Sequence, residues 1–292
     1  MEPLAIPWLD RAEYPFRSNF ITLNGQRLHY IDEGAGETLL FVHGTPSWSF
    51  DFRNVIKPLS SQFRCVALDH IGFGLSAKPR QYDYSTQRHA QTLREFIESL
   101  HLQDITLIMH DFGGPIGFSY ALQQPAQIRR IVVLNSWLWS SELEPGFQKM
   151  RKVLRNPLLP FLYRYLNISP RFIVPASFGD KSKLTPAIHR HYTRPFARPA
   201  DRNGLLAFAR SLLHDQPWFE SLWEQRHRLT NKPMVLVWGL KDPLVTPEYL
   251  RRFQAGFPQS QTLTLPQSGH FPQEEESEAV VGAIFRLMQE TP

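Results

Sequence analysis

The sequence is short of the features that mark secreted and membrane proteins. Its only cysteine is Cys65, so no disulfide can form within the chain and the fold does not depend on an oxidising compartment. No uncharged apolar run is long enough to cross a membrane, and the first residues lack the basic patch and apolar stretch of a secretion signal. We therefore expect a cytoplasmic protein without a membrane span.

Acidic residues are also scarce in the middle of the chain. Residues 145–222 contain 13 Lys or Arg and 4 Asp or Glu, a local charge of +9 in a chain whose formal total is +5. Such a segment can attract nucleic acid, an anionic membrane or an acidic substrate. The basic residues are dispersed among prolines and aromatic residues, and no nucleic-acid-binding module is recognisable. A solvated helical surface and no nucleic-acid partner are therefore predicted.

The rest of the composition is that of a globular protein. Hydrophobic residues make up 42% of the 292 residues and charged residues 20%, a balance too apolar for a disordered chain. The length allows one large α/β domain with an insertion, or two modest domains. Either arrangement can bury a substantial core.

Short apolar runs that end at polar or glycine-rich loops predict the strands of a sheet. They lie at residues 20–23, 27–31, 38–42, 63–68, 105–109, 131–134, 234–238 and 262–265. Asn24-Gly25 between the first two runs predicts a tight antiparallel hairpin. The later runs are apolar throughout, as buried strands are. They alternate along the chain with segments whose apolar residues have helical spacing, such as residues 85–100. This pattern favours an α/β fold with a mostly parallel sheet covered by helices on both faces.

Between residues 139 and 226 the pattern changes. Helical periodicity is broken repeatedly by proline, and no convincing buried strand is present. Such a segment is typical of a helical cap inserted into a sheet domain. We expect a core formed by residues 1–138 and 227–292, with the cap at residues 139–226.

One aspartate stands where a nucleophile would be exposed. The predicted strand at residues 105–109 leads into His110-Asp111-Phe112-Gly113-Gly114. The small residues after Asp111 let the backbone pack closely beneath a sharp turn from strand to helix. Such a turn is a nucleophile elbow, here with aspartate in the position that serine usually holds.

Two further titratable residues follow the last two predicted strands. Asp242 lies in the loop after residues 234–238, and His270 in the loop after residues 262–265. Parallel sheets build their sites at the carboxyl ends of the strands, so Asp111, Asp242 and His270 are predicted to converge as nucleophile, acid and histidine. Taken singly, Asp242 also fits a turn and His270 a helix cap. Their order and placement together favour the catalytic interpretation.

The chain resembles the α/β-hydrolase family of haloalkane dehalogenases and epoxide hydrolases, whose members use an aspartate nucleophile. The likeness extends over nearly the whole length. It rests on the motifs His43-Gly44-Thr45-Pro46-Ser47-Trp48, Asp69-His70-Ile71-Gly72-Phe73-Gly74-Leu75-Ser76, His110-Asp111-Phe112-Gly113-Gly114 and Gly269-His270-Phe271-Pro272-Gln273-Glu274. The last motif is more similar to that of dehalogenases than to that of epoxide hydrolases. The resemblance implies an α/β-hydrolase fold with an inserted helical cap.

A carboxylate nucleophile implies two chemical steps. Asp111 can attack an sp³ carbon, expel halide and become an alkyl ester. His270 can then activate water to hydrolyse the ester, while Asp242 orients the imidazole and stabilises its protonated form. By likeness to the family, the backbone N–H groups of Thr45 and Phe112 form the oxyanion hole. We expect a haloalkane dehalogenase-like hydrolase that acts on a small apolar substrate with water.

Two positions depart from the family pattern for holding halide. Dehalogenases usually have Trp after the nucleophile, and many have Asn in the first motif, where this chain has Phe112 and Thr45. Phenylalanine offers no donor to the leaving halide. Trp137 and Trp139, just beyond a predicted strand, can supply an indole N–H or serve as packing residues.

Asn135 marks a third departure. Some family members carry the triad acid at this position instead. Asparagine cannot stabilise an imidazolium as a carboxylate does, so Asp242 is the better candidate for the acid.

Other functions remain open at this stage. Epoxide hydrolysis would need paired cap tyrosines to protonate the opening alkoxide, for which Tyr163, Tyr165 and Tyr192 are available. Another aspartate-nucleophile hydrolase, acting on a β-lactone or a haloacetate, also fits, and a basic cap would suit a substrate that carries a carboxylate. The fold can also serve as a non-catalytic ligand-binding receptor, which would have no need of the three triad residues together.

No cofactor or metal is expected. Gly72-Phe73-Gly74 lacks the third glycine of a dinucleotide-binding loop and follows the wrong strand. His189-Arg190-His191 has poor spacing for metal ligation on a helix, and no carboxylate cluster accompanies it. The sequence leaves the oligomeric state undetermined.

Overall fold

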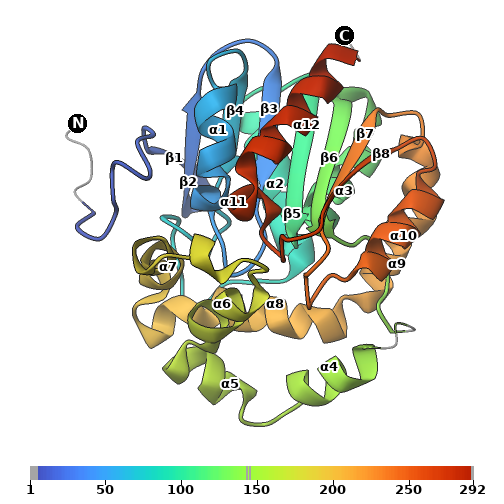
Figure 1. Cartoon of the computed structure of the whole chain (residues 1–292). Coiled ribbons are helices and arrows are strands. Elements are labelled where there is room, and N and C mark those ends of the chain that lie inside the picture. Colours follow the sequence, from blue (N-terminus) through green and yellow to red (C-terminus); the bar gives the residue numbers. More distant parts are fainter. Residues whose placement is uncertain (1–5, 143, 145, 291–292) are drawn as a thin grey trace.

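The computed structural model describes residues 6–142, 144 and 146–290, and its centre is an eight-stranded sheet (Figure 1). The strands are β1 (Asn19–Leu23), β2 (Gln26–Glu33), β3 (Thr38–Val42), β4 (Arg64–Leu68), β5 (Ile105–Asp111), β6 (Ile128–Ser136), β7 (Met234–Gly239) and β8 (Gln261–Leu265). Their spatial order is β1-β2-β4-β3-β5-β6-β7-β8. Only β2 runs antiparallel to its neighbours β1 and β4; the pairs from β4 to β8 are parallel. The predicted mostly parallel sheet is confirmed.

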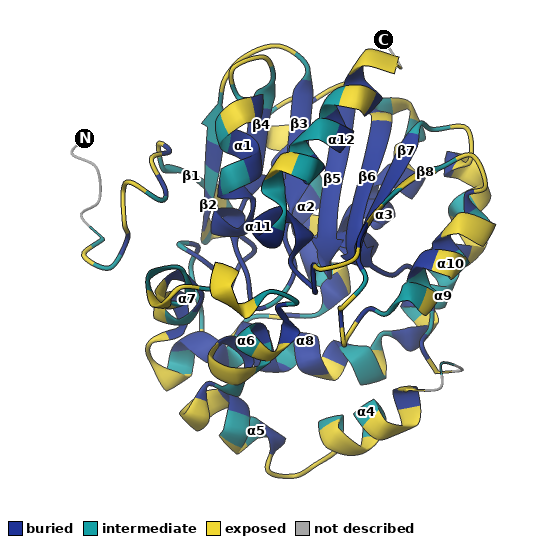
Figure 2. Cartoon of the chain, viewed as in Figure 1, coloured by how far each residue is buried: buried dark blue, intermediate teal, exposed yellow. Residues whose placement is uncertain are grey.

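Helices cover both faces of the sheet. One face carries α1 (Arg53–Leu59), α11 (Pro272–Glu275) and α12 (Ser277–Glu290), and the other carries α2 (Thr86–Ser99), α3 (Gly113–Gln123) and α10 (Pro247–Gly256), as Figure 1 shows. Successive residues of a strand point to opposite faces, so Phe41 and Ile108 join one apolar core while Leu40 and Leu107 join the other. Figure 2 shows the central strands as the most buried part of the molecule.

The start of α2 illustrates why the sequence forms these elements where it does. Ser85 precedes the helix in an extended conformation, and its hydroxyl accepts a hydrogen bond from the backbone N–H of Arg88 at 3.2 Å. This contact satisfies one of the N–H groups that have no partner inside a helix. The helix predicted at residues 85–100 is therefore found at Thr86–Ser99.

Between β6 and β7 every regular element of the described residues is helical. These elements are α4 (Phe147–Leu154), α5 (Leu159–Phe161), η3 (Leu162–Leu166), η4 (Ser169–Ile173), α6 (Val174–Ser177), η5 (Lys181–Lys183), α7 (Pro186–Thr193), η6 (Arg194–Phe196), η7 (Pro199–Arg202), α8 (Asn203–His214), α9 (Gln216–Glu224) and η8 (Gln225–Leu229). The remaining short helices are η1 (Ser49–Phe52) and η2 (Pro125–Gln127). Both α9 and η8 contact α3 of the core, so the exact division between core and cap stays a prediction.

No helix among the described residues combines the length and the apolar character that a membrane crossing requires. The elements α4 to α8 instead lie across one end of the sheet (Figure 1). That end is formed by the carboxyl ends of the parallel strands, where the predicted site residues are found.

Candidate active site

Asp111 stands at a strained turn at the end of β5. Its φ angle is +53°, in the left-handed region that non-glycine residues seldom adopt. The next turn of chain passes so close to β3 that a Cβ on Gly113 would lie 2.0 Å from the carbonyl oxygen of Val42. The hydroxyl of Ser136 donates to the backbone carbonyl of Asp111 at 2.6 Å. The turn is thus held from both sides and presents the carboxylate above the sheet.

The three predicted triad residues meet at this end of the sheet. Nε2 of His270 lies 3.4 Å from Oδ2 of Asp111, and Nδ1 of His270 lies 2.7 Å from Oδ2 of Asp242. All three side chains are buried. Asp111 ends β5, Asp242 follows β7 and His270 follows β8, so strands far apart in sequence bring the three predicted triad residues into one series of contacts.

The carboxylate of Asp242 is held by Asn135, a residue of the neighbouring strand β6. Nδ2 of Asn135 donates to Oδ2 of Asp242 at 2.8 Å, and the backbone N–H of Leu244 donates to Oδ1 at 2.7 Å. Oδ1 of Asn135 accepts from the N–H of Gly239 at 2.8 Å. Asn135 therefore occupies the position at which some family members carry the triad acid. In this chain it donates a hydrogen bond to the predicted acid, Asp242.

The two carboxylates decide the protonation of the imidazole. Burial alone would lower the pKa of His270, but the charge of Asp242 and the contact with Asp111 outweigh it and raise the pKa to about 10. With both carboxylates free, His270 is therefore an imidazolium at neutral pH. Removal of either negative charge would lower this pKa.

One carboxylate oxygen of Asp111 accepts a hydrogen bond from a predicted oxyanion-hole donor. The backbone N–H of Thr45 donates to Oδ1 of Asp111 at 2.8 Å. Phe112 directly follows the nucleophile and precedes α3, and N–H groups at the start of a helix have no partner within it. A Cβ on Gly44 would lie 2.1 Å from Oδ1, so this approach of the two loops requires glycine.

Comparisons with known proteins agree with this geometry. The model of the alpha/beta hydrolase fold family matches residues 37–277. The chain is 32% identical over 278 residues to haloalkane dehalogenase 2 of Mycobacterium tuberculosis, covering 94% of this chain and 96% of that protein. The chain belongs to the α/β hydrolase fold family.

Other relatives have different names. The chain is 33% identical over 288 residues to the cis-3-alkyl-4-alkyloxetan-2-one decarboxylase of Shewanella oneidensis, covering 95% of this chain and 90% of that protein. The crystal structure of haloalkane dehalogenase DatA of Agrobacterium tumefaciens superimposes with a TM-score of 0.84 at 23% identity, covering 94% of this chain and 97% of that one. The latter likeness supports the fold of this α/β hydrolase.

The site of this α/β hydrolase opens into a cavity of about 700 Å³. Its wall combines the loops after β3, β5, β6, β7 and β8 with residues of the cap. Most of the lining side chains are apolar, among them Phe147, Met150, Leu159, Ile173 and Leu205. No lysine or arginine is present among the described residues that line it. The positive charge of the cap is therefore directed away from the site.

The two tryptophans considered as halide donors have different surroundings. Trp137 lines the cavity, its ring meets that of Phe112 edge to face at 4.8 Å, and its buried Nε1 has no hydrogen-bond partner among the described residues. Trp139 is packed against Trp223 and donates from Nε1 to Glu144 at 3.2 Å. Trp139 is also absent from the described residues that line the cavity. The site therefore has one unengaged indole donor, on Trp137.

The cap tyrosines do not form a pair at the cavity. Tyr163 lines it, and burial raises the pKa of this phenol to about 12. Tyr165 is exposed on the outside of the cap. The hydroxyl of Tyr192 donates to Asp51 at 2.9 Å, below the site. The acid pair that epoxide opening requires is thus not assembled from these residues.

A second histidine lies beneath the triad. Nε2 of His110 is 2.7 Å from the backbone carbonyl of His270, and its Nδ1 is 3.2 Å from Oδ2 of Asp51. Nε2 therefore faces a backbone carbonyl and Nδ1 faces a carboxylate. Burial would raise the pKa of Asp51, but the hydrogen bond with His110 and further donors lower it. His110 thus lies between the backbone carbonyl of His270 and the buried carboxylate of Asp51.

Nothing in this site indicates a metal. The described residues contain no group of three or more histidine, cysteine or acidic side chains placed to hold an ion.

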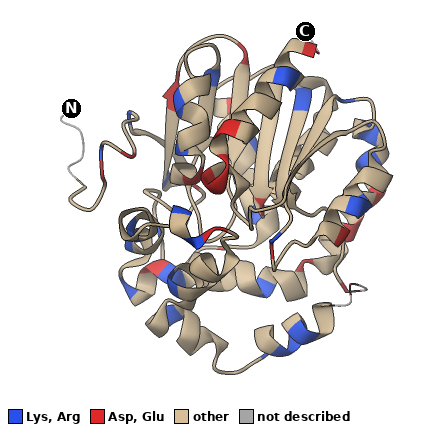
Figure 3. Cartoon of the chain, in the orientation of Figure 1, with Lys and Arg blue, Asp and Glu red and all other residues tan. Residues whose placement is uncertain are grey.

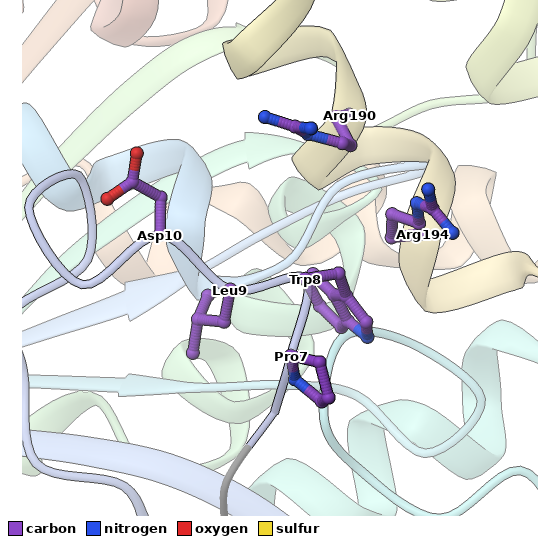
Figure 4. A pocket seen from close by; sticks show the side chains of 6 residues that line it. All are labelled: Pro7, Trp8, Leu9, Asp10, Arg190 and Arg194. Atoms are coloured by element: carbon purple, nitrogen blue, oxygen red, sulfur yellow. The ribbon is translucent and has the colours of Figure 1, made fainter.

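A separate hollow of about 420 Å³ lies where residues 7–10 meet α7 and η6 of the cap, with Arg190 and Arg194 on its wall (Figure 4). No triad residue lines it.

Proposed function

We propose that this α/β hydrolase is a dehalogenase-like enzyme that cleaves the carbon–halogen bond of an apolar substrate through an ester on Asp111. The observation that carries the proposal is the chain of contacts from Asp111 through His270 to Asp242 at the wall of an apolar cavity. The relatives named haloalkane dehalogenase support it.

In the first step, the carboxylate attacks the carbon in line with the halogen. Oδ1 of Asp111 is held by the N–H of Thr45, so Oδ2 is the attacking oxygen and Oδ1 becomes the carbonyl oxygen of the ester. The carbon–halogen electron pair leaves with the halide. The unengaged indole N–H of Trp137 and the buried, unpartnered hydroxyl of Thr45 are the donors available to it.

In the second step, water attacks the ester carbon and His270 accepts its proton. Esterification removes the negative charge of Asp111, and with it part of what keeps His270 protonated. The imidazole therefore becomes basic only after the ester has formed. Asp242 remains ionised beside Nδ1 and stabilises the imidazolium as water is deprotonated.

The cavity narrows the class of substrate. Its volume falls within the range of about 300–1,000 Å³ that is typical of pockets for drug-sized ligands, so a longer or branched haloalkane fits better than a one-carbon compound. Haloacetates are disfavoured, because the described lining offers no lysine or arginine to a carboxylate. Epoxides are disfavoured because, of the three cap tyrosines considered, Tyr163 alone is among the described residues that line the cavity.

A β-lactone is the second candidate substrate. The 33% identical relative is named for action on an oxetan-2-one, which is a four-membered lactone. Attack of Asp111 on the ring sp³ carbon would open the lactone and release a carboxylate within the same molecule. This substrate is neutral before attack, as the apolar lining requires, and the donors on Trp137 and Thr45 would then face the new carboxylate.

Intact-protein mass spectrometry of a His270→Phe variant distinguishes these reactions. Without its base, the variant should retain any ester formed on Asp111 during incubation with bromoalkanes, epoxides, haloacetates or β-lactones. A gain equal to the alkyl group without halogen identifies dehalogenation, whereas a gain equal to the whole compound identifies epoxide or lactone opening. The control is the double variant Asp111→Asn/His270→Phe, which should gain no mass. If the folded single variant is labelled by none of these compounds, the proposal is wrong.

A further inference from the structure

We propose that the outer surface of the cap, formed by residues 147–172, binds the surface of an anionic lipid bilayer. The first observation is a concentration of exposed apolar side chains in this segment. It holds all but one of the large hydrophobic residues that are exposed among the described residues, the exception being Leu244: Val153, Leu158, Phe161, Tyr165, Leu166 and Phe172. Large apolar side chains gathered on a surface mark an interaction site more often than single scattered ones do.

The second observation is the charge of the same segment. Residues 147–172 contain no aspartate or glutamate and carry the basic residues Lys149, Arg151, Lys152, Arg155, Arg164 and Arg171. None of these six forms an ion pair with a described residue. Figure 3 shows α4 marked by basic residues, with no acidic residue on it. The positive charge is therefore free to act on a partner outside the molecule.

The third observation is where this surface lies. Figure 1 shows α4 and α5 at the side of the cap farthest from the sheet, and Figure 2 shows their outward sides as exposed. Val153 and Leu244 line the cavity although their exposed fractions are 63% and 49%. These two residues mark an opening of the cavity beside the apolar and basic segment. A bilayer bound there would face the entrance of a pocket lined mainly by apolar side chains.

The mixture of residues favours a bilayer over other partners. Interfacial segments combine aromatic and leucine side chains, which enter the headgroup region, with lysine and arginine, which bind anionic headgroups. A second copy placed against the same surface would oppose six uncompensated positive charges with six others. A nucleic acid would use the charges and leave the exposed Phe161 and Phe172 in water. Of these three partners, only an anionic bilayer uses both kinds of side chain.

Vesicle co-sedimentation of the full chain tests the proposal without reference to its chemistry. The protein should sediment with vesicles of equal parts phosphatidylglycerol and phosphatidylcholine and remain free with pure phosphatidylcholine. A basic residue near an anionic surface contributes roughly a fivefold change in partitioning, so Lys149→Gln/Lys152→Gln should lower binding by about 25-fold. The matched control is Arg80→Gln/Arg228→Gln, which makes the same change in net charge at exposed positions outside the segment and should alter binding less than about threefold.

A second variant tests the apolar contribution. Phe161→Ser/Phe172→Ser should weaken binding at high salt, where the charges are screened, whereas the lysine variant acts mainly at low salt. Both pairs are exposed and neither lines the cavity, so the circular dichroism spectrum and the thermal unfolding midpoint should stay unchanged and report correct folding. Binding that does not depend on phosphatidylglycerol, or that falls equally in the control, overturns the proposal. So does a native dimer that Phe161→Ser/Phe172→Ser converts to a monomer, because a second copy would then cover this surface.

Discussion

Asn135 and His270 bind the same oxygen of Asp242. Nδ2 of Asn135 lies 2.8 Å from Oδ2, and Nδ1 of His270 lies 2.7 Å from it. Asn135 therefore fixes the direction of the carboxylate, and the carboxylate in turn fixes the ring. This makes Asn135 a positioning residue whose effect should appear in the step that uses the imidazole as a base.

Replacing Asn135 should slow ester hydrolysis more than ester formation. Hydrogen bonds to charged groups are worth about 1.5–3 kcal/mol, so Asn135→Ala should lower the hydrolysis rate constant roughly 10- to 100-fold. Asn135→Asp keeps an acceptor for the N–H of Gly239 but places a second carboxyl group beside Asp242, and its pH profile should shift. Rapid-quench measurement of both steps checks this, with accumulated ester as the expected sign. An equal loss in both steps would indicate a structural role alone.

Stabilisation of the leaving halide should depend on Trp137 and should not depend on Trp139. Trp137→Phe removes the indole N–H that has no other described partner, and ester formation from a bromoalkane should fall about 10- to 100-fold. Trp139→Phe is the matched control, since Trp139 is absent from the described cavity lining and its N–H is already donated to Glu144. Single-turnover rates of both variants decide the matter. Equal rates for Trp137→Phe and the native chain would assign the halide to other donors.

The elements that sequence predicts well are those with sharp local signals. The apolar run ending at Asp111 and the glycines that follow it define a strand, a turn and a helix without knowledge of their neighbours. The helix at Thr86–Ser99 is marked by the helical spacing of its apolar residues. Placement of Asp242 and His270 after strands required only that parallel strands end at one edge of the sheet.

Features that depend on packing between distant elements could not be predicted. Trp137 and Trp139 are two positions apart, and only the packing of the chain after β6 decides which indole faces the cavity. The contact between Asn135 and Asp242 depends on the register of β6 and β7. The basic residues of the cap suggested a substrate with a carboxylate, but their helices direct them outward. Nor does any predicted element correspond to α1, which is short and contains Pro58.

The pKa of His270 should follow the charge of its two neighbours. In the native chain the imidazole should titrate at about 10, and Asp111→Asn should lower this pKa because it removes one negative charge and leaves burial in place. Asp242→Asn should lower it further, since the charge of Asp242 is the larger cause of the raised pKa. Nitrogen-15 NMR of the imidazole as a function of pH measures all three. A native pKa near that of a free histidine would contradict the proposed switch of the base.

The raised pKa also has a consequence for stability. A histidine with a folded pKa above its unfolded value stabilises the fold fully at low pH, and this contribution is lost as the pH rises through the folded pKa. The free energy of unfolding should therefore decline between about pH 6.5 and pH 10 in the native chain. Urea titrations across this range should show a smaller decline for Asp242→Asn. An unchanged slope in that variant would mean that another group is responsible.

Acid should destabilise the fold through a second group of buried histidines, whose rings pack against one another at tilted and edge-to-face angles. The rings of His43 and His70 lie 4.4 Å apart, and those of His70 and His89 lie 5.1 Å apart. Burial lowers the pKa of all three, that of His89 to about 3. Neither ring nitrogen of His89 has a hydrogen-bond partner among the described residues. Below about pH 6.5 these histidines are protonated in the unfolded chain but stay neutral in the folded chain. The free energy of unfolding therefore decreases as the pH falls.

Replacing His89 by an apolar residue of similar size should remove part of this sensitivity. In His89→Leu, two buried nitrogens without partners are exchanged for methyl groups, so the free energy of unfolding should rise at pH 7 and rise further at pH 5. The matched control His214→Leu alters an exposed histidine on α8 and should leave the acid limb unchanged. Urea unfolding at both pH values measures the difference. A gain that is equal at pH 7 and pH 5 would show that packing, and not the protonation of His89, limits stability in acid.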